Sequence, residues 1–180
     1  MKSRALILPG IDNSDSGHWQ SIWQSADPDF VRVEQRDWEY PVCAEWVGSL
    51  EQALINESES VVLVAHSLGC LLVAHWAAQS TRKIRGALLV APPSPETAPA
   101  AAIFEKVATG FLPVPIIPFN FPSIVVASSN DTYSDLYSTK LYAEAWGSGF
   151  INMGPIGHIN TSSRLGAWKE GYSLYRQLSC

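Results

Sequence analysis

The sequence predicts an α/β fold in which a mostly parallel sheet carries helices on both faces. Short β-branched runs alternate with longer amphipathic stretches along the chain, which is the element order of such a fold. The chain has 180 residues, of which 47% are hydrophobic and 16% charged. We expect a single domain over residues 1–180. Folding at this size removes about 70% of the surface of the open chain, so a core can form without metals or disulfides.

Six short apolar runs are the predicted strands, and a turn-forming or helix-breaking residue bounds each of them. In chain order they are residues 4–8, 30–34, 60–65, 85–91, 123–128 and 149–153. Between them, the helical spacing of apolar positions predicts five helices. These are residues 19–25, 43–56, 68–79, 139–146 and 162–178.

The stretch 92–122 departs from this alternation. Eight prolines flank one short helix-like piece, 100–108. Because proline is unsuited to a core strand or a long helix, we expect an excursion over the sheet, either an irregular loop or a substrate lid. Its apolar side chains are expected to form a wall that favours short acyl or aromatic groups: Phe111, Leu112, Ile116, Ile117, Phe119 and Phe121.

Composition and patterning argue against several partners. Lys and Arg number 12 against 17 Asp and Glu, and no dense basic run could follow a phosphate backbone, so we expect no nucleic-acid partner. The apolar runs fall far short of the roughly 20 residues that a membrane helix needs. Pro9-Gly10 also breaks the first run before it could serve as a signal peptide. We therefore expect a cytoplasmic protein with no membrane association.

Metal and cofactor sites are not expected either. The four histidines are scattered, and the loop after the first strand has one glycine where a dinucleotide loop has three. The three cysteines, Cys43, Cys70 and Cys180, are too widely spaced for a disulfide framework or a zinc site. We expect them to be reduced structural thiols.

The strongest chemical signal lies at residues 61–72. An apolar strand leads through Ala-His-Ser-Leu-Gly, at positions 65–69, into an apolar helix, which is the pattern of a nucleophile elbow. Ala65 and Gly69 are small, as they must be where strand and helix backbones approach each other around the serine. Ser67 is therefore the expected nucleophile.

An elbow of this kind also predicts where an oxyanion would be bound. The backbone N–H of Leu68 lies at the start of the helix after Ser67 and is one expected donor. The second should come from the loop that follows the first strand, where we expect the N–H of Ile11. The alternative is that Pro9-Gly10 in this loop is only a turn.

A serine nucleophile needs a histidine base, and the histidine needs a carboxylate. In folds with a nucleophile elbow the acid follows a later strand and the histidine comes last. Asp131 follows the fifth predicted strand and His158 the sixth, so both belong at the carboxyl end of the sheet with Ser67. Asp135 remains an alternative to Asp131.

Structural roles are expected for the other candidate side chains. Asp37 should cap or pack, and His66 should support the elbow. His75 lies about two helical turns from Ser67 and should pack its helix. His18 should anchor the loop after the first strand, although it could also line the site.

Several motifs together suggest a family. They are Pro9-Gly10 followed by His18-Trp19-Gln20 and Trp23, Asp37-Trp38 with Pro41 and Trp46, His66-Ser67-Leu68-Gly69, Ser129-Asn130-Asp131 with Tyr133, and Gly157-His158-Ile159-Asn160. Over nearly its whole length the chain resembles the small α/β-hydrolase serine hydrolases grouped with retinoblastoma-binding protein 9 and the bacterial YdeN-like proteins.

The resemblance implies a three-layer α/β-hydrolase-like fold, no cofactor, and a triad at Ser67, Asp131 and His158. Thr132 departs from the family pattern, which often has proline after the acid. The Leu-x-Cys-x-Glu motif of the animal member is also absent, because Pro41 stands where the motif needs leucine. No retinoblastoma-type partner is therefore expected.

Taken together, the residues predict a carboxylesterase-like serine hydrolase that cleaves a small ester or related acyl substrate through an acyl-enzyme. Two alternatives remain open. One is a non-catalytic binding protein on the same fold, and the other is an acyltransferase or thioesterase with the same nucleophile.

Overall fold

The computed structural model describes residues 3–55, 57 and 61–179. Within them, six strands form one sheet in the order β2-β1-β3-β4-β5-β6, and every neighbouring pair is parallel. The strands are β1 (Ala5–Leu8), β2 (Phe30–Arg32), β3 (Val62–His66), β4 (Gly86–Val90), β5 (Ser123–Ala127) and β6 (Gly149–Asn152). The predicted parallel sheet is confirmed, with strand ends displaced by one or two residues. The predicted start of the third strand, Ser60, lies outside the described residues.

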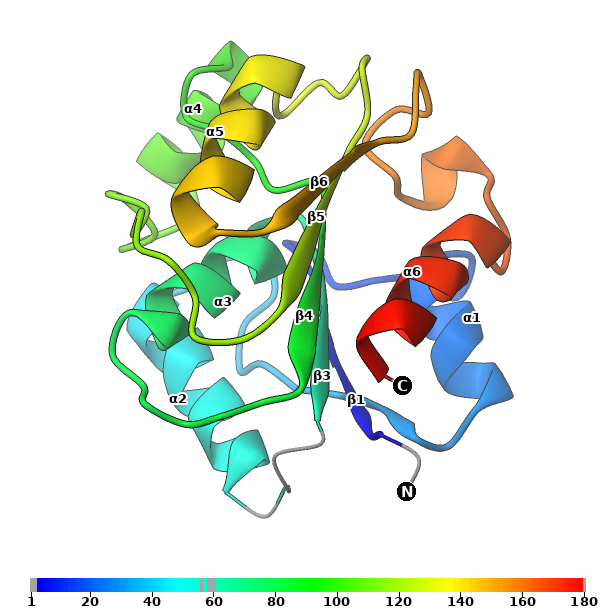
Figure 1. Cartoon of the computed structure of the whole chain (residues 1–180). Helices are drawn as coiled ribbons and strands as arrows, with labels where there is room; N and C mark the ends of the chain where they lie inside the picture. Colours follow the sequence, from blue (N-terminus) through cyan, green and yellow to red (C-terminus); the bar gives the residue numbers. More distant parts are fainter. Residues whose placement is uncertain (1–2, 56, 58–60, 180) are drawn as a thin grey trace.

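Helices cover both faces of the sheet, which gives three layers (Figure 1). One face carries α2 (Cys43–Leu54), α3 (Leu68–Ala77) and α5 (Leu136–Trp146), while the other carries α1 (Trp19–Ala26) and α6 (Lys169–Ser179). A shorter helix, α4 (Ala98–Lys106), lies in the proline-rich excursion. Asn56, the predicted end of the second helix, lies outside the described residues.

Two hydrophobic clusters hold the layers together, one on each face of the sheet. Alternate residues along a strand point to opposite faces, so Leu6 joins the cluster under α2 and α3 while Ile7 joins the one under α1 and α6. The central strands β3 and β4 are covered on both faces and are therefore apolar at nearly every position.

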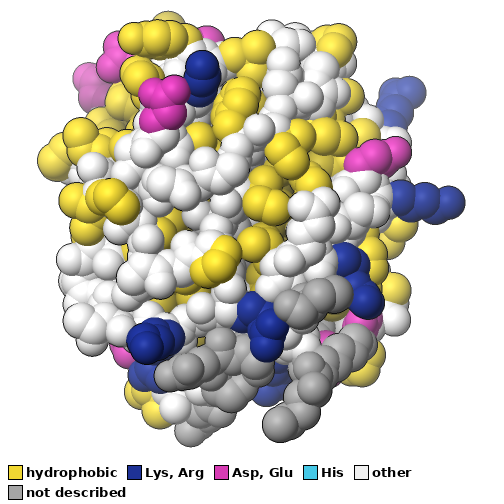
Figure 2. All heavy atoms as spheres, in the orientation of Figure 1, with side chains coloured by type: hydrophobic (Ala, Val, Ile, Leu, Met, Phe, Trp, Pro, Cys, Tyr) yellow, Lys and Arg dark blue, Asp and Glu magenta, His cyan; other side chains and the backbone are white. Residues whose placement is uncertain are grey.

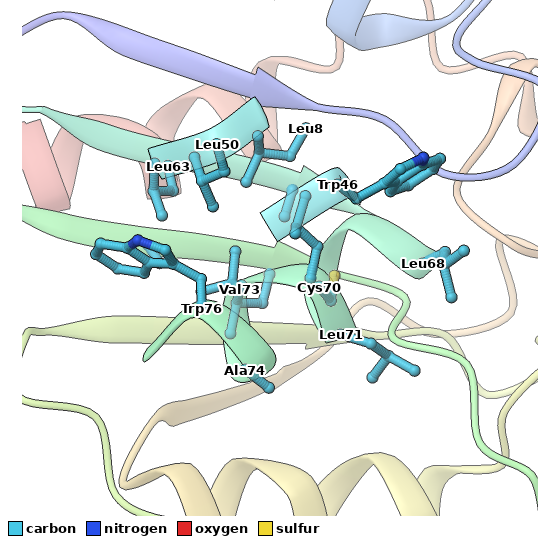
Figure 3. Close-up of a cluster of buried hydrophobic side chains, with 14 of the residues drawn as sticks. Leu8, Trp46, Leu50, Leu63, Leu68, Cys70, Leu71, Val73, Ala74 and Trp76 are labelled. Atoms are coloured by element: carbon cyan, nitrogen blue, oxygen red, sulfur yellow. The ribbon is translucent and has the colours of Figure 1, made fainter. Parts of the chain in front are cut away.

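Helix α3 is buried almost all round, which explains its lack of a polar face. Figure 3 shows Val73 and Trp76 of this helix beside Leu63 of β3 and Leu50 of α2. Truncating one such leucine to alanine typically costs about 2–5 kcal/mol. This core fixes the first turn of α3, where Ser67 enters the helix.

The C-terminal helix begins later than predicted. The apolar spacing of residues 162–178 predicted one helix, but a short 3₁₀ helix at Thr161–Ser163 comes first, and α6 begins only at Lys169. The backbone between them is left-handed at Arg164, Gly166 and Trp168, which no α-helix can include. The apolar spacing gave the wrong helix start because Trp168, which fits the helical pattern, lies in the loop and packs its buried ring against α1.

Figure 2 shows one face of the molecule, on which most of the visible Lys and Arg side chains lie in the lower half and hydrophobic side chains are scattered over the whole face. No helix among the described residues is long and apolar enough to cross a membrane. Cys43 and Cys70 are free and buried, and Cys180 lies outside the described residues.

Candidate active site

Ser67 occupies a strained turn between β3 and α3. Its φ of 53° and ψ of −124° lie outside the regions that side-chain-bearing residues prefer, which costs about 1–3 kcal/mol. A hydrogen bond from its N–H to the carbonyl of Val90, 2.9 Å long, helps to hold the turn. A β-carbon on Gly69 would lie 2.2 Å from the carbonyl oxygen of Leu8, so only glycine fits there. The elbow is thus built as its sequence predicted.

Ser67, His158 and Asp131 form a continuous chain of hydrogen-bonding groups. The Nε2 atom of His158 lies 2.9 Å from Oγ of Ser67. Its Nδ1 atom lies 2.9 Å from both carboxylate oxygens of Asp131. When Nδ1 donates to the carboxylate, Nε2 is left free to accept the serine proton. The arrangement has the geometry of a nucleophile, a base and an orienting acid.

The alternative acid has a different role in the structure. Asp135 caps α5 by accepting a hydrogen bond of 2.7 Å from the N–H of Ser138. Asp131 instead directs one oxygen to His158 and to the N–H of Tyr133. The structure therefore brings Asp131, and not Asp135, against the histidine.

The loop that carries His158 is held from several sides. Nε2 of His66 donates to the carbonyl of His158 at 2.9 Å, and the indole N–H of Trp19 donates to the carbonyl of Ile159 at 2.8 Å. The side-chain oxygen of Asn130 accepts from the N–H of Gly157 at 2.7 Å. His66, expected to support the elbow, thus binds the loop of the other histidine. Sequence reasoning missed the contacts of Trp19 and Asn130, which join segments far apart in the chain.

The predicted oxyanion donors lie on two segments beside the serine. Leu68 is the first residue of α3, where backbone N–H groups have no partner within the helix. Ile11 follows Gly10 in the loop after β1, and both Ile11 and Leu68 line the same pocket as Ser67. A β-carbon on Gly10 would lie 3.3 Å from Oγ of Ser67, so the loop closely approaches the nucleophile.

A polar network fixes the loop that carries Ile11. Arg32 donates to the side-chain oxygen of Asn13 and, at 3.0 Å, to the carbonyl of Ser14. The hydroxyl of Ser14 donates to buried Gln20 at 2.7 Å, and Gln20 donates to the carbonyl of Val64 in β3. Of these residues, the sequence motifs shared with the family included Gln20. The contribution of Arg32 was not predicted.

Three imidazoles lie in a row beside Ser67. The ring centres of His18 and His66 are 4.7 Å apart, and those of His66 and His158 are 4.9 Å apart. Burial lowers the pKa of His18 to about 4 and holds the pKa of His66 well below its ordinary value. These two rings are therefore neutral at neutral pH. His18 also anchors its loop as expected, since its Nδ1 accepts from the N–H of Gln20 at the start of α1.

A pocket of about 320 Å³ opens over Ser67 and His158. Its apolar lining includes Ala100, Ile103 and Phe104 of α4. The prediction that residues 111–121 form the apolar wall of the pocket is wrong. Phe111 is buried against Trp46, and Phe121 packs beside Trp76. The other four predicted side chains do not line the pocket either: Leu112, Ile116, Ile117 and Phe119. The excursion does supply a wall, but through its helix.

The remaining expected roles are structural. Asp37 caps a turn by accepting from the N–H groups of Glu39 and Tyr40. His75 hydrogen bonds through Nε2 to the carbonyl of Phe111 at 3.0 Å, which ties α3 to the excursion. Among the residues described, no group of three or more His, Cys, Asp or Glu side chains could hold a metal ion.

Comparison with known proteins gives several matches. A family model described as serine hydrolase matches residues 5–177. A YdeN-like hydrolase from Pectobacterium atrosepticum is similar in structure, with 30% sequence identity and a TM-score of 0.84, over 98% of this chain and 90% of that chain. The ydeN gene product of B. subtilis is 17% identical with a TM-score of 0.77, over 98% of each chain.

A more distant match is a thermophilic esterase from Thermogutta terrifontis. It is 13% identical, with a TM-score of 0.69, over 99% of this chain and 91% of that chain. No curated protein matches the sequence. Together the matches confirm the three-layer α/β fold and the resemblance that the motifs predicted.

Proposed function

Because the chain belongs to the serine hydrolase family, we propose that it hydrolyses small carboxylic esters through an acyl-enzyme formed on Ser67. The single observation that supports this most is the hydrogen-bonded chain from Asp131 through His158 to Ser67. His158 and Asp131 are both largely buried, with side-chain exposures of 10% and 2%. Little water therefore competes for the hydrogen bond between His158 and Asp131.

Acylation follows from the positions of these groups. Oγ of Ser67 attacks the carbonyl carbon of the ester while its proton passes to Nε2 of His158. The carbonyl electron pair moves onto oxygen, and the N–H groups of Leu68 and Ile11 stabilise that charge. Loss of one such donor typically costs about 100- to 1000-fold in rate. The intermediate then collapses, the carbon–oxygen bond of the ester breaks, and the departing alcohol takes the proton from His158.

Deacylation repeats the same steps with water. A water molecule attacks the acyl carbon and passes a proton to Nε2 of His158. The bond to Oγ breaks, Ser67 recovers its proton from His158, and the carboxylic acid leaves. Asp131 holds the imidazole in the correct tautomer and stabilises its cation in both halves. Every step uses groups of this chain, substrate and water.

Hydrolysis of ethyl butyrate, followed by titration of the released acid, tests the proposal. The wild type should turn over, and Ser67→Ala should lose about 10⁴-fold or more in kcat. Ser173→Ala, on the exposed face of α6, is the matched control and should keep full activity. Equal rates for wild type and Ser67→Ala would contradict the proposal. So would transfer of the acyl group to an added alcohol with no acid released, which would indicate an acyltransferase.

A further inference from the structure

The pocket over Ser67 has two walls of different chemistry. Helix α4 lies over the sheet face that carries α2, α3 and α5, whereas the segment around residues 161–163, orange in Figure 1, lies over the face of α1 and α6. Both segments line the pocket. The carboxyl ends of the strands, with Ser67, lie between them.

The wall from α4 is apolar. Ala100, Ile103 and Phe104 are spaced i, i+3 and i+4, so they share one face of the helix. Ala100 is buried, and Ile103 and Phe104 also pack against the core. Both ends of the segment are tied down, at Ser94 to the carbonyl of Tyr133 and at Thr109 to the carbonyl of Pro41, each at 2.9 Å. This wall offers an acyl chain hydrophobic contact and no hydrogen bond.

The other wall is polar and joins two loops. One carboxylate oxygen of Asp15 accepts from the N–H of Gly17 at 2.8 Å and from the hydroxyl of Thr161 at 2.9 Å. The side-chain oxygen of Asn160 accepts from the N–H of Ser162 at 3.1 Å. Within the described part of the chain, the second oxygen of Asp15 and the amide nitrogen of Asn160 make no hydrogen bond. An acceptor and a donor thus remain for a ligand hydroxyl.

The chemistry decides which part of an ester meets which wall. The leaving alcohol must receive its proton from Nε2 of His158, so it departs on the side of that residue. Two residues after His158 the chain reaches Asn160–Ser162, which belong to the polar wall. The carbonyl oxygen is directed to the N–H groups of Leu68 and Ile11. The substituent on the acyl carbon is therefore left to face α4.

The charge of the side chains that line the pocket limits the class of alcohol further. Apart from its histidines and Tyr133, the ionisable side chains of the pocket are Asp12 and Asp15, and no Lys or Arg is among the described residues that line it. The hydrogen bond from Thr161 lowers the pKa of Asp15, which keeps its carboxylate ionised. An alcohol that carries a carboxylate or phosphate would be repelled.

We propose that the substrates are esters of short apolar acids with hydroxylated alcohols that carry no negative charge, with the acyl chain against α4 and the alcohol against Asp15 and Asn160. This inference rests on the proposed function. The volume of about 320 Å³ agrees with it, because it lies at the lower end of ligand pockets and suits a small ester.

A set of four esters tests the two walls separately. Glyceryl butyrate, ethyl butyrate, glyceryl octanoate and O-butyrylglycolate are compared by kcat/KM. For the wild type we expect glyceryl butyrate to exceed each of the other three by about tenfold, the range that pocket contacts of this kind give. Ethyl butyrate differs from glyceryl butyrate only in the alcohol, and glyceryl octanoate differs from it only in the acyl chain. O-butyrylglycolate differs from ethyl butyrate only by a carboxylate in place of a methyl group, so that pair tests charge.

Two variants should separate the walls. Phe104→Ala enlarges the apolar side and should raise the octanoate-to-butyrate ratio about tenfold, while the glyceryl-to-ethyl ratio stays the same. Asp15→Asn keeps an oxygen for Gly17 and Thr161 but removes the charge and the free acceptor. It should lower the glyceryl-to-ethyl ratio and raise the rate on O-butyrylglycolate, with no change in chain-length preference. Glu105→Gln, exposed on α4 and outside the pocket lining, is the control.

The outcomes distinguish this inference from the proposed function. Equal wild-type rates on all four esters would overturn the inference and leave ester hydrolysis standing. An effect of Phe104→Ala on the alcohol preference, or of Asp15→Asn on chain length, would also overturn it. No hydrolysis of any ester, with no reaction of Ser67 with a fluorophosphonate, would overturn the proposed function and the inference with it.

Discussion

Gly10 lies so close to Ser67 that a β-carbon on it would stand 2.8 Å from Cβ of the serine. Real β-carbons do not approach to this distance, so one of the two segments would have to move. Gly10 belongs to the loop that carries the N–H of Ile11, and Ser67 carries the nucleophile. The glycine therefore allows the proposed oxyanion donor and the proposed nucleophile to share one small site.

Gly10→Ala should reduce kcat by about 100-fold, because a displacement of about 1 Å in a catalytic group has that effect. An added methyl group would contact Ser67 and the carbonyl of His66, so the substitution should displace the elbow. Ester hydrolysis kinetics measure the loss, and circular dichroism shows whether the fold persists. Unchanged kcat in a folded Gly10→Ala protein would contradict this view of the loop.

Gly69→Ala should damage folding rather than chemistry alone. Its β-carbon would meet the carbonyl oxygens of Leu8 at 2.2 Å and Pro9 at 2.8 Å, and these backbone atoms belong to β1 and its end. We expect a loss of about 3 kcal/mol or more in the free energy of unfolding, as overpacking against backbone requires the strand and the helix to separate. Urea denaturation measures it. A loss below about 1 kcal/mol would show that β1 and α3 can separate easily.

Asp131→Asn should lower kcat by about 10⁴-fold with little change in structure, because an amide cannot hold the imidazole in the tautomer that accepts the serine proton. Asp135→Asn is the matched control. Asparagine also caps helices well, so this variant should keep both stability and kcat. If the two variants lost activity equally, the assignment of Asp131 as the orienting acid would be wrong.

His18 should make stability depend on pH. Its native pKa of about 4 lies below the ordinary value of 6.5, so between these pH values the unfolded chain binds a proton that the native state does not. The free energy of unfolding should therefore fall as the pH drops from 6.5 to 4, by about 3 kcal/mol from this group. Above pH 6.5 the contribution is complete.

His18→Asn removes the titration but keeps a side chain that can cap α1. Urea denaturation at several pH values between 4 and 6.5 should give a shallower slope for the variant than for the wild type. His66, whose pKa is lowered mainly by burial, is present in both proteins, so the difference between the slopes reports on the removal of His18. Identical slopes would show that His18 is not buried as a neutral ring.

The sequence predicts those residues of the site whose type and order along the chain are set by the catalytic chemistry. A serine elbow needs small neighbours, and an acid and a histidine must follow later strands, so Ser67, Asp131 and His158 could be chosen before their distances were known. The structure places them within hydrogen-bonding distance. Their catalytic roles remain predictions until activity is measured.

The parts that sequence reasoning missed depend on tertiary packing. An aromatic residue in a proline-rich stretch can line a pocket or fill the core, and only the path of the chain places Phe111 in the core and Phe104 in the pocket. Similarly, nothing local indicates that Arg32 of β2 would hold Asn13 in the loop after β1. Trp168 has helical spacing from its neighbours but lies in left-handed backbone, because its ring packs on α1.

The central claim is that Ser67 is an activated nucleophile, and labelling with a fluorophosphonate tests it most directly. The purified wild type should bind one equivalent covalently, with the label on the peptide that contains Ser67, and Ser67→Ala should remain unlabelled. Asp131→Asn should react much more slowly, since its histidine is held in the wrong tautomer. A folded wild type that does not react, or a label that persists in Ser67→Ala, would contradict the account.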